Sequence, residues 1–279
     1  MNRHVFCIKW GTRYGPDYVN RLRAMTARHL TLQHQFVCFT DDPAGLHPEI
    51  QHLPLPELGV AHPENVPGKW RKTALWQKDL FGLTGTALFI DLDTVIVANL
   101  DDFFQHGDPD DIILTRNWLK PHKRLGQTTL FRFPIGGYPQ VYEEFKKDPQ
   151  GIADRYQFEQ HYVTSHVADN LHFWPKEWVR HYRVHCLGNN YLMRYFRPAR
   201  LPTGAKAIAF PGVPNPAEAA AGIWNGKQDH HPSPWEHFRA AFSQETRIKP
   251  TPISHLKCYQ QPCPWVSEHW TEDEAPSGP

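Results

Sequence analysis

The chain has 279 residues, of which 40% are apolar and 21% are charged, a composition typical of a globular protein with a buried core. Its formal net charge is +1, and no run of lysine and arginine is long enough to follow a nucleic-acid backbone, so nucleic acid is not an expected partner. No apolar stretch approaches the roughly 20 residues of a transmembrane segment, and residues 1–10 lack the apolar core of a secretory signal. Together with five scattered cysteines, an odd number, these features predict a cytoplasmic protein with reduced thiols.

The first part of the chain alternates strand and helix signals. Residues 4–10 form a short apolar strand pattern, and a glycine-containing turn then leads to a helix that opens with Pro16 at a favoured first-turn position. A second strand is expected at 35–40, followed by a Pro- and His-rich loop with one short strand near 50–53. Residues 69–81 carry apolar side chains at close to helical spacing, which predicts a helix packed on the sheet.

Residues 87–97 form a nearly continuous apolar run, interrupted only around Asp91 and Asp93. Such a run predicts one central strand that is buried on both faces. Strands alternating with helices predict an α/β fold with a parallel or mixed sheet. Further elements are expected downstream, with strands at 112–115, 129–133 and 206–210 and a helix at 139–147.

Two carboxylates within a buried strand need a partner, because an unpaired charge in an apolar core is costly. Asp91 and Asp93 flank Leu92, and alternate residues of an extended chain point to the same side, where like charges repel unless a divalent cation lies between them. Mg²⁺ and Mn²⁺ fit this role, since they take one or two carboxylates together with phosphate oxygens. The placement at the end of a strand therefore predicts a metal-diphosphate site. The alternative is that the pair caps a helix near Leu100, or is satisfied by arginine and backbone donors.

Several motifs along most of the chain carry a resemblance to a known family. They are Lys9-Trp10-Gly11 with Tyr14, Tyr18 and Asn20; Phe39-Thr40-Asp41-Asp42; Gly68-Lys69-Trp70-Arg71-Lys72; Phe89-Ile90-Asp91-Leu92-Asp93 through Asp101-Asp102-Phe103; Phe173-Trp174-Pro175 with Trp178; and residues 210–216. In this order they resemble the bacterial GT-A glycosyltransferases, most closely glycosyltransferase family 8 and its uncharacterised relatives. The resemblance implies a Rossmann-like GT-A single domain over 1–270, with a central mixed, mostly parallel sheet flanked by helices. Its nucleotide-binding part would cover about 1–117 and its acceptor part about 118–270, whereas the acidic, Pro- and Gly-rich residues 271–279 are expected to form a flexible tail.

The resemblance also implies which residues hold the nucleotide. Trp10, Gly11 and Tyr14 would line the base or ribose pocket, although both aromatic side chains could instead cover the edge of the sheet. Asp41 and Asp42 would hydrogen-bond the ribose or the base, and their alternative role is to form a turn before the next residue, a proline.

Three cations and three residues from elsewhere complete the predicted donor site. Lys69, Arg71 and Lys72 open the expected helix, where cations oppose the helix dipole unless an anion is nearby. A bound diphosphate would supply that anion, and a solvated surface is the alternative. The remaining predicted nucleotide-sugar contacts are Leu92, Gly212 and Pro214.

Two departures from the family pattern affect the predicted catalytic residues. Members of the family often carry a histidine before the glycine of the late loop as a further metal ligand, and here that position is Pro211. His231 is the expected replacement, with Asp229, His230 and His255 as other candidates, or the metal uses only the two aspartates and phosphate oxygens. The acidic pair that lies near the sugar in the family corresponds to Glu159 and Gln160 in this chain.

These residues together imply a hexosyltransferase-like enzyme. Mn²⁺ or Mg²⁺ held by Asp91 and Asp93 would neutralise the leaving diphosphate, while a sugar passes from a nucleotide-sugar donor, a UDP-sugar, to a glycan or glycolipid acceptor. Peripheral contact with a membrane that carries the acceptor is compatible with this prediction. One rival is a haloacid-dehalogenase-like phosphatase with Asp91 as nucleophile, because residues 91–95 fit its motif. The other is a non-catalytic sugar-binding protein on the same fold, suggested by Pro211.

Overall fold

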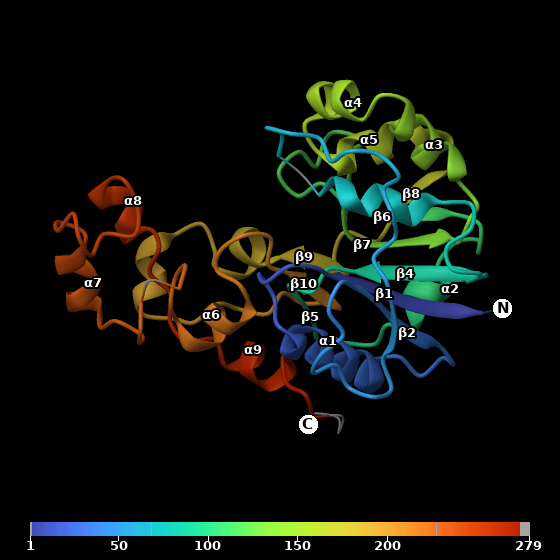
Figure 1. The fold of residues 1–279 in the computed structure, drawn as a ribbon. Helices are drawn as coiled ribbons and strands as arrows, with labels where there is room; N and C mark the ends of the chain where they lie inside the picture. Colours follow the sequence, from blue (N-terminus) through green and yellow to red (C-terminus); the bar gives the residue numbers. More distant parts are fainter. Residues whose placement is uncertain (1, 68, 227, 274–279) are drawn as a thin grey trace. The chain divides into compact units, whose positions relative to one another are not determined.

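The computed structural model describes residues 2–67, 69–226 and 228–273 (Figure 1). The chain divides into two compact units, each of which is described by itself. Unit 1 comprises Met1–Arg23, Leu30–Leu92 and Asn99–Lys176, and unit 2 comprises Ala24–His29, Asp93–Ala98 and Glu177–Pro279. The predicted tail lies outside the described residues from 274 onward. None of the helices in the described ranges is long and apolar enough to cross a membrane.

Unit 1 is built on a seven-stranded sheet with the order β3-β2-β1-β4-β7-β6-β8. All its strands run in one direction except β7, which is antiparallel to both of its neighbours. The strands are β1 (Arg3–Lys9), β2 (Gln35–Thr40), β3 (Gln51–Leu53), β4 (Thr86–Ile90), β6 (Ile112–Arg116), β7 (Gly126–Pro134) and β8 (Leu171–Phe173). This mixed, mostly parallel sheet confirms the predicted α/β fold.

Helices cover this sheet on both faces. Figure 1 shows α3 (Pro139–Lys147), α4 (Pro149–Tyr156) and α5 (Glu159–His166) on one side of it and α2 (Asp101–Gln105) on the other. Aromatic side chains fill the space under the first group, where the Trp70 and Phe145 rings stack at 5.4 Å and Trp76 lies 5.0 Å from Phe133. The remaining helices of unit 1 are η1 (Trp70–Trp76), η2 (Ala168–Asn170) and the first part of α1 (Pro16–His29).

The prediction of one strand over 87–97 is wrong. The run contains two strands, β4 in the seven-stranded sheet and β5 (Thr94–Ile96), which pairs antiparallel with β10 (Ala207–Ala209) in unit 2. Asp91 follows β4 directly, and Leu92 and Asp93 form a turn before β5. Both strands are fully buried within their own sheets, so the run is apolar throughout and hydropathy carries no sign of the break. The argument that Asp91 and Asp93 point to the same side of an extended strand therefore no longer applies.

The helix predicted over 69–81 is also shorter than expected. It is a 3₁₀ helix, η1, and it ends at Trp76 because Gln77 adopts an extended conformation. Phe81 and Gly82 have φ values of 55° and 71°, which a right-handed helix cannot contain. The apolar spacing beyond Trp76 thus comes from a loop that packs against the core.

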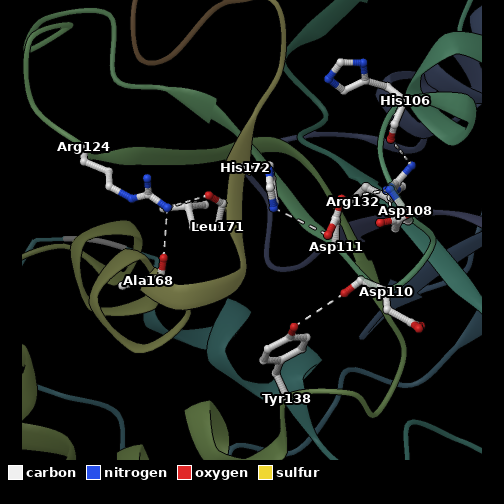
Figure 2. Close-up of polar contacts among 10 residues, drawn as sticks. All are labelled: His106, Asp108, Asp110, Asp111, Arg124, Arg132, Tyr138, Ala168, Leu171 and His172. Atoms are coloured by element: carbon white, nitrogen blue, oxygen red, sulfur yellow. Dashed lines mark hydrogen bonds and ion pairs between the residues drawn. The ribbon is translucent and has the colours of Figure 1, made fainter.

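A fully buried arginine ties α2 to the sheet. Arg132 on β7 donates to the carbonyl oxygens of Phe103 and Phe104, each at 3.2 Å. It also donates to the carbonyl oxygens of His106, at 2.7 Å, and of Asp108 (Figure 2). These acceptors include carbonyl groups at the end of α2, which lack partners within the helix. Burial lowers the pKa of the guanidinium, and Asp111 and Asp108 oppose this shift. We therefore assign Arg132 a structural role in fixing this helix end.

Unit 2 contains a three-stranded sheet of order β5-β10-β9, with β9 at Val179–His181, and many short helices. Several of these begin with a proline in the first turn, and in three of the helices that begin with proline the N-cap side chain accepts a backbone N–H. The five cysteines are buried and free, as the sequence predicts. The helical segments are η3 (Tyr182–Cys186), η4 (Tyr191–Tyr195), α6 (Pro216–Ala221), α7 (Pro234–Ala240), α8 (Pro252–Leu256), α9 (Pro264–His269) and the last part of α1.

Candidate functional site

The carboxyl ends of four parallel strands meet at one edge of the sheet in unit 1. β1, β2, β4 and β6 all end there, so that Trp10, Asp41, Asp91 and Asn117 each follow the end of a strand. This edge is where open α/β sheets bind ligands. Unit 1 therefore brings most of the predicted donor-site residues to one place.

The turn after β1 is joined to the end of β2 by direct hydrogen bonds. The backbone N–H of Gly11 donates to Asp41 Oδ2 at 3.0 Å, and Lys9 Nζ donates to the carbonyl oxygen of Asp42 at 2.9 Å. Asp42 Oδ1 accepts the N–H of Ala44, so this carboxylate forms the turn that the sequence offered as its alternative role. Gly11 has a φ of 61°, a left-handed conformation that favours glycine.

Trp10 is exposed beside two cations. Its exposed fraction is 46%, and Lys69 Nζ and Arg71 Cζ each lie 5.5 Å from the centre of its ring. Tyr14 instead packs on Tyr18, at a distance of 4.6 Å between ring centres. Trp10 thus presents an aromatic surface with positive charge next to it, whereas Tyr14 packs against its neighbour on α1.

Lys72 and Asp91 form a partly buried ion pair under this edge. Lys72 Nζ lies 2.6 Å from Asp91 Oδ1, donates to the carbonyl oxygen of Thr128 at 2.9 Å, and lies 4.7 Å from the ring centre of Phe89. The Lys72 side chain is 9% exposed and that of Asp91 is 29% exposed. Two of the three ammonium donors are therefore used within the protein. Lys72 fixes the Asp91 carboxylate and is not a freely solvated cation.

Glu159 lies buried next to this pair. Its Oε2 accepts from Thr128 Oγ1 at 2.7 Å, and its Oε1 has no hydrogen-bond partner among the described residues. Burial raises the pKa of Glu159 to about 7, against the opposing effects of Lys72 and Thr128. Gln160 follows it in the first turn of α5. Glu159 therefore sits near its protonation midpoint at neutral pH.

The predicted residues Asp93, Gly212, Pro214 and His231 belong to unit 2. His231 Nδ1 lies 2.9 Å from the carbonyl oxygen of Gly222, and its Nε2 lies 3.4 Å from Tyr259 Oη. As a metal ligand, His231 would have to give up one of these partners. Across the described ranges, no group of three or more His, Cys, Asp or Glu side chains is arranged to hold a metal ion.

Sequence reasoning did not foresee the contacts of Lys72 and Thr128. The sequence predicts Lys72 as a diphosphate contact at the start of a helix, and it gives no indication of a role for Thr128. The sequence does contain a signal, because Lys72 lies between Trp70 and the apolar run from Ala74 to Trp76. A lysine in such a segment requires a counter-ion, and Asp91 provides it.

Comparison with known proteins identifies the fold. No protein-family model and no curated protein matches the chain. Among solved structures, it is similar to the galactosyltransferase LgtC in complex with donor and acceptor sugar analogs, with a TM-score of 0.55 and 9% identity over 76% of this chain and 88% of that chain. It is also similar to the glycosyltransferase GlyE of Streptococcus pneumoniae TIGR4, with a TM-score of 0.54 and 10% identity over 77% of this chain and 56% of that one. This chain has a GT-A glycosyltransferase fold.

A third GT-A match is the bifunctional glycosyltransferase WbbM, with a TM-score of 0.52 and 12% identity over 77% of this chain. The chain spans about half the length of the GlyE and WbbM chains, 56% and 46% respectively. At these identities the likeness is one of fold. It confirms the GT-A architecture that the motif order predicts, and membership of family 8 stays a prediction.

Proposed function

We propose that this chain is a glycosyltransferase that moves a sugar from a nucleotide-sugar, a UDP-sugar, to a glycan or glycolipid acceptor. The observation that carries the proposal is the juxtaposition at one sheet edge of exposed Trp10, the cations Lys69 and Arg71, and the Asp91 carboxylate. The GT-A fold supports glycosyl transfer over the phosphatase that the Asp91 motif also allows.

The donor chemistry of Asp91 fits a divalent cation. Its Oδ1 is held by Lys72, and its side chain is 29% exposed, so the carboxylate remains accessible to a ligand. Hard oxygen donors of this kind suit Mn²⁺ or Mg²⁺. Asp93, two residues further along the sequence, stays the second predicted ligand. When bound, such a cation would act as a Lewis acid on the leaving diphosphate.

The residues of unit 1 suggest how the donor is bound and cleaved. The Trp10 ring would stack on the nucleobase, and Lys69 and Arg71 beside it would attract the diphosphate. The bond between the anomeric carbon and the diphosphate oxygen breaks, the diphosphate leaves with the electron pair, and the acceptor oxygen forms the new bond as it loses its proton. Lys72 would hold Asp91 in position throughout. Glu159 and Gln160 stay predictions for contacts with the sugar.

Ligand-dependent melting tests the proposal. We expect UDP-sugars with Mn²⁺ to raise the Tm of the full chain by about 5 °C at a hundredfold excess over Kd. Without Mn²⁺, or in Asp93→Asn, the shift should disappear. An unchanged shift in the variant contradicts the assigned metal site. A phospho-aspartate trapped at Asp91 would instead support the phosphatase, and sugar binding without nucleotide or metal would support a binding protein.

The base-stacking role of Trp10 gives a second prediction. Trp10→Ala should weaken UDP binding by about tenfold or more, because stacking of a base on an aromatic ring contributes roughly 1–3 kcal/mol. Calorimetric titration of UDP with Mn²⁺ measures the change. Trp235, which is 64% exposed on α7 in unit 2, provides the matched control as Trp235→Ala. Equal Kd values for both variants would rule out the stacking role.

A further inference from the structure

A basic loop follows β6 at the same sheet edge as the proposed donor site. Residues 117–125 connect β6 to β7, and Lys120, His122 and Lys123 at the tip of this loop are exposed, as is Leu119 at 72%. The sequence contains no acidic residue from 112 to 142. The loop therefore presents a concentration of positive charge.

Both ends of the loop are held by specific hydrogen bonds. Asn117 Oδ1 accepts the backbone N–H groups of Leu119 and Lys120, each at 3.0 Å, which closes the turn that leaves β6. At the other end, Arg124 Nη2 donates to the carbonyl oxygens of Ala168 and Leu171 at 3.0 and 2.8 Å, as Figure 2 shows. These hydrogen bonds therefore fix both ends of the loop, and the exposed tip lies between them.

The charges at the tip are not neutralised within the described part of unit 1. No acidic side chain there lies within ion-pair distance of Lys120 or Lys123. Lys120 is close enough to His161 on α5 to contribute to lowering the pKa of that histidine, after burial as the main cause. His161 lies two residues after Glu159. Exposed cations without counter-ions are suited to a negatively charged ligand.

The loop also lies close to the proposed reaction centre. It ends at Leu125, three residues before Thr128, whose carbonyl oxygen accepts from Lys72. Since an extended chain rises about 3.3 Å per residue, this separation is at most about 10 Å. The end of the loop therefore lies close to the contact between Lys72 and Thr128.

We propose that loop 117–125 binds an acidic group, a phosphate or a carboxylate, carried by the acceptor glycan. This inference rests on the proposed glycosyl transfer and defines its acceptor as anionic. The pair Lys120 and Lys123 matches one or two acidic groups, too few for a nucleic-acid backbone. Leu119 beside them offers an apolar contact for the non-polar face of a sugar ring.

Retention on immobilised glycans tests the proposal. The full chain is applied to neutral, phosphorylated and uronic-acid-containing oligosaccharides at low and moderate salt. We expect the wild type to be retained on both acidic sets at low salt and to be released at moderate salt. Lys120→Ala/Lys123→Ala should bind these glycans about tenfold more weakly, which corresponds to the loss of two surface ion pairs. Lys120→Glu/Lys123→Glu should abolish retention. Lys146→Ala/Lys147→Ala on α3 is the matched control and should behave like the wild type.

Several outcomes would overturn the proposal. They are equal retention on neutral glycans, equal retention of the lysine variants, or no retention on any acidic glycan. Capture by vesicles containing phosphatidylglycerol without capture by soluble acidic glycans would assign the loop to a lipid surface instead. In the same lysine variants, UDP-sugars should raise the Tm by as much as they do in the wild type. If UDP-sugars do not raise the Tm of the wild type, the proposed function is wrong. If they do, but the wild type is not retained on acidic glycans, only the proposed acceptor is wrong.

Discussion

Asp91→Asn is expected to lower the release of UDP from UDP-sugars by about 100-fold or more, because in the proposed mechanism this carboxylate would hold the cation that neutralises the leaving group. The amide of asparagine retains an oxygen that can accept from Lys72, but it lacks the negative charge that a divalent cation requires. Lys72 keeps its hydrogen bond to the carbonyl oxygen of Thr128, so unit 1 should still fold. Initial rates in Mn²⁺, measured well below the melting temperature of the variant, give the fold-change.

A matched substitution separates this effect from a general change of charge. Asp110 is exposed, belongs to the same unit and is not among the predicted site residues, so Asp110→Asn should retain wild-type activity. Addition of EDTA should reduce the wild type to the level of Asp91→Asn and leave that variant unchanged. Full activity of Asp91→Asn in a folded protein would contradict the proposed mechanism.

Glu159→Gln is expected to stabilise unit 1 at alkaline pH and not at acidic pH. The pKa of Glu159 is raised from 4.5 to about 7 in the folded chain, mainly by burial. Between these values the folded state keeps a proton that the unfolded state releases, so the free energy of unfolding falls as pH rises through this window. At pH 8 the cost of the buried charge is about 3 kcal/mol, an order-of-magnitude value, and glutamine removes it. Glutamine also retains an acceptor for Thr128 Oγ1.

Urea unfolding of wild type and variant in EDTA at pH 5, 6.5 and 8 measures this effect. The free energy of unfolding of Glu159→Gln, relative to that of the wild type, should rise by about 2.5 kcal/mol from pH 5 to pH 8. Glu143→Gln on α3 serves as the control for loss of a surface carboxylate, because Glu143 is an exposed glutamate that pairs with Lys146. Parallel pH profiles for wild type and Glu159→Gln would mean that Glu159 ionises normally in the fold.

The sequence predicts the elements whose signals are local. The strand at Gln35–Thr40 and the helix at Pro139–Lys147 appear with the predicted bounds, because each is delimited by polar or proline residues next to a clear apolar pattern. The strand and turn before Pro16 are likewise correct within one residue. Local signals sufficed for the alternation of strands and helices, whereas the end of β4 immediately before Asp91 was not predicted.

What the sequence could not predict depends on contacts between distant segments. The break between β4 and β5 is invisible because both strands are equally apolar, although they belong to different sheets. The Lys72–Asp91 pair joins residues far apart in the chain, and spacing alone does not identify such partners. The raised pKa of Glu159 likewise follows from tertiary burial, which its place in a short, weakly amphipathic helix does not indicate.

Gly11 shows how backbone handedness alone can fix a residue's identity. A Cβ added there would meet no atom within 4 Å, so the left-handed φ, and not a shortage of room, disfavours other residues. A D-amino acid, whose preferred torsions mirror those of its L counterpart, would fit this position without strain. Semisynthesis could thus install a reporter group immediately beside Trp10 while leaving the turn between β1 and α1 intact.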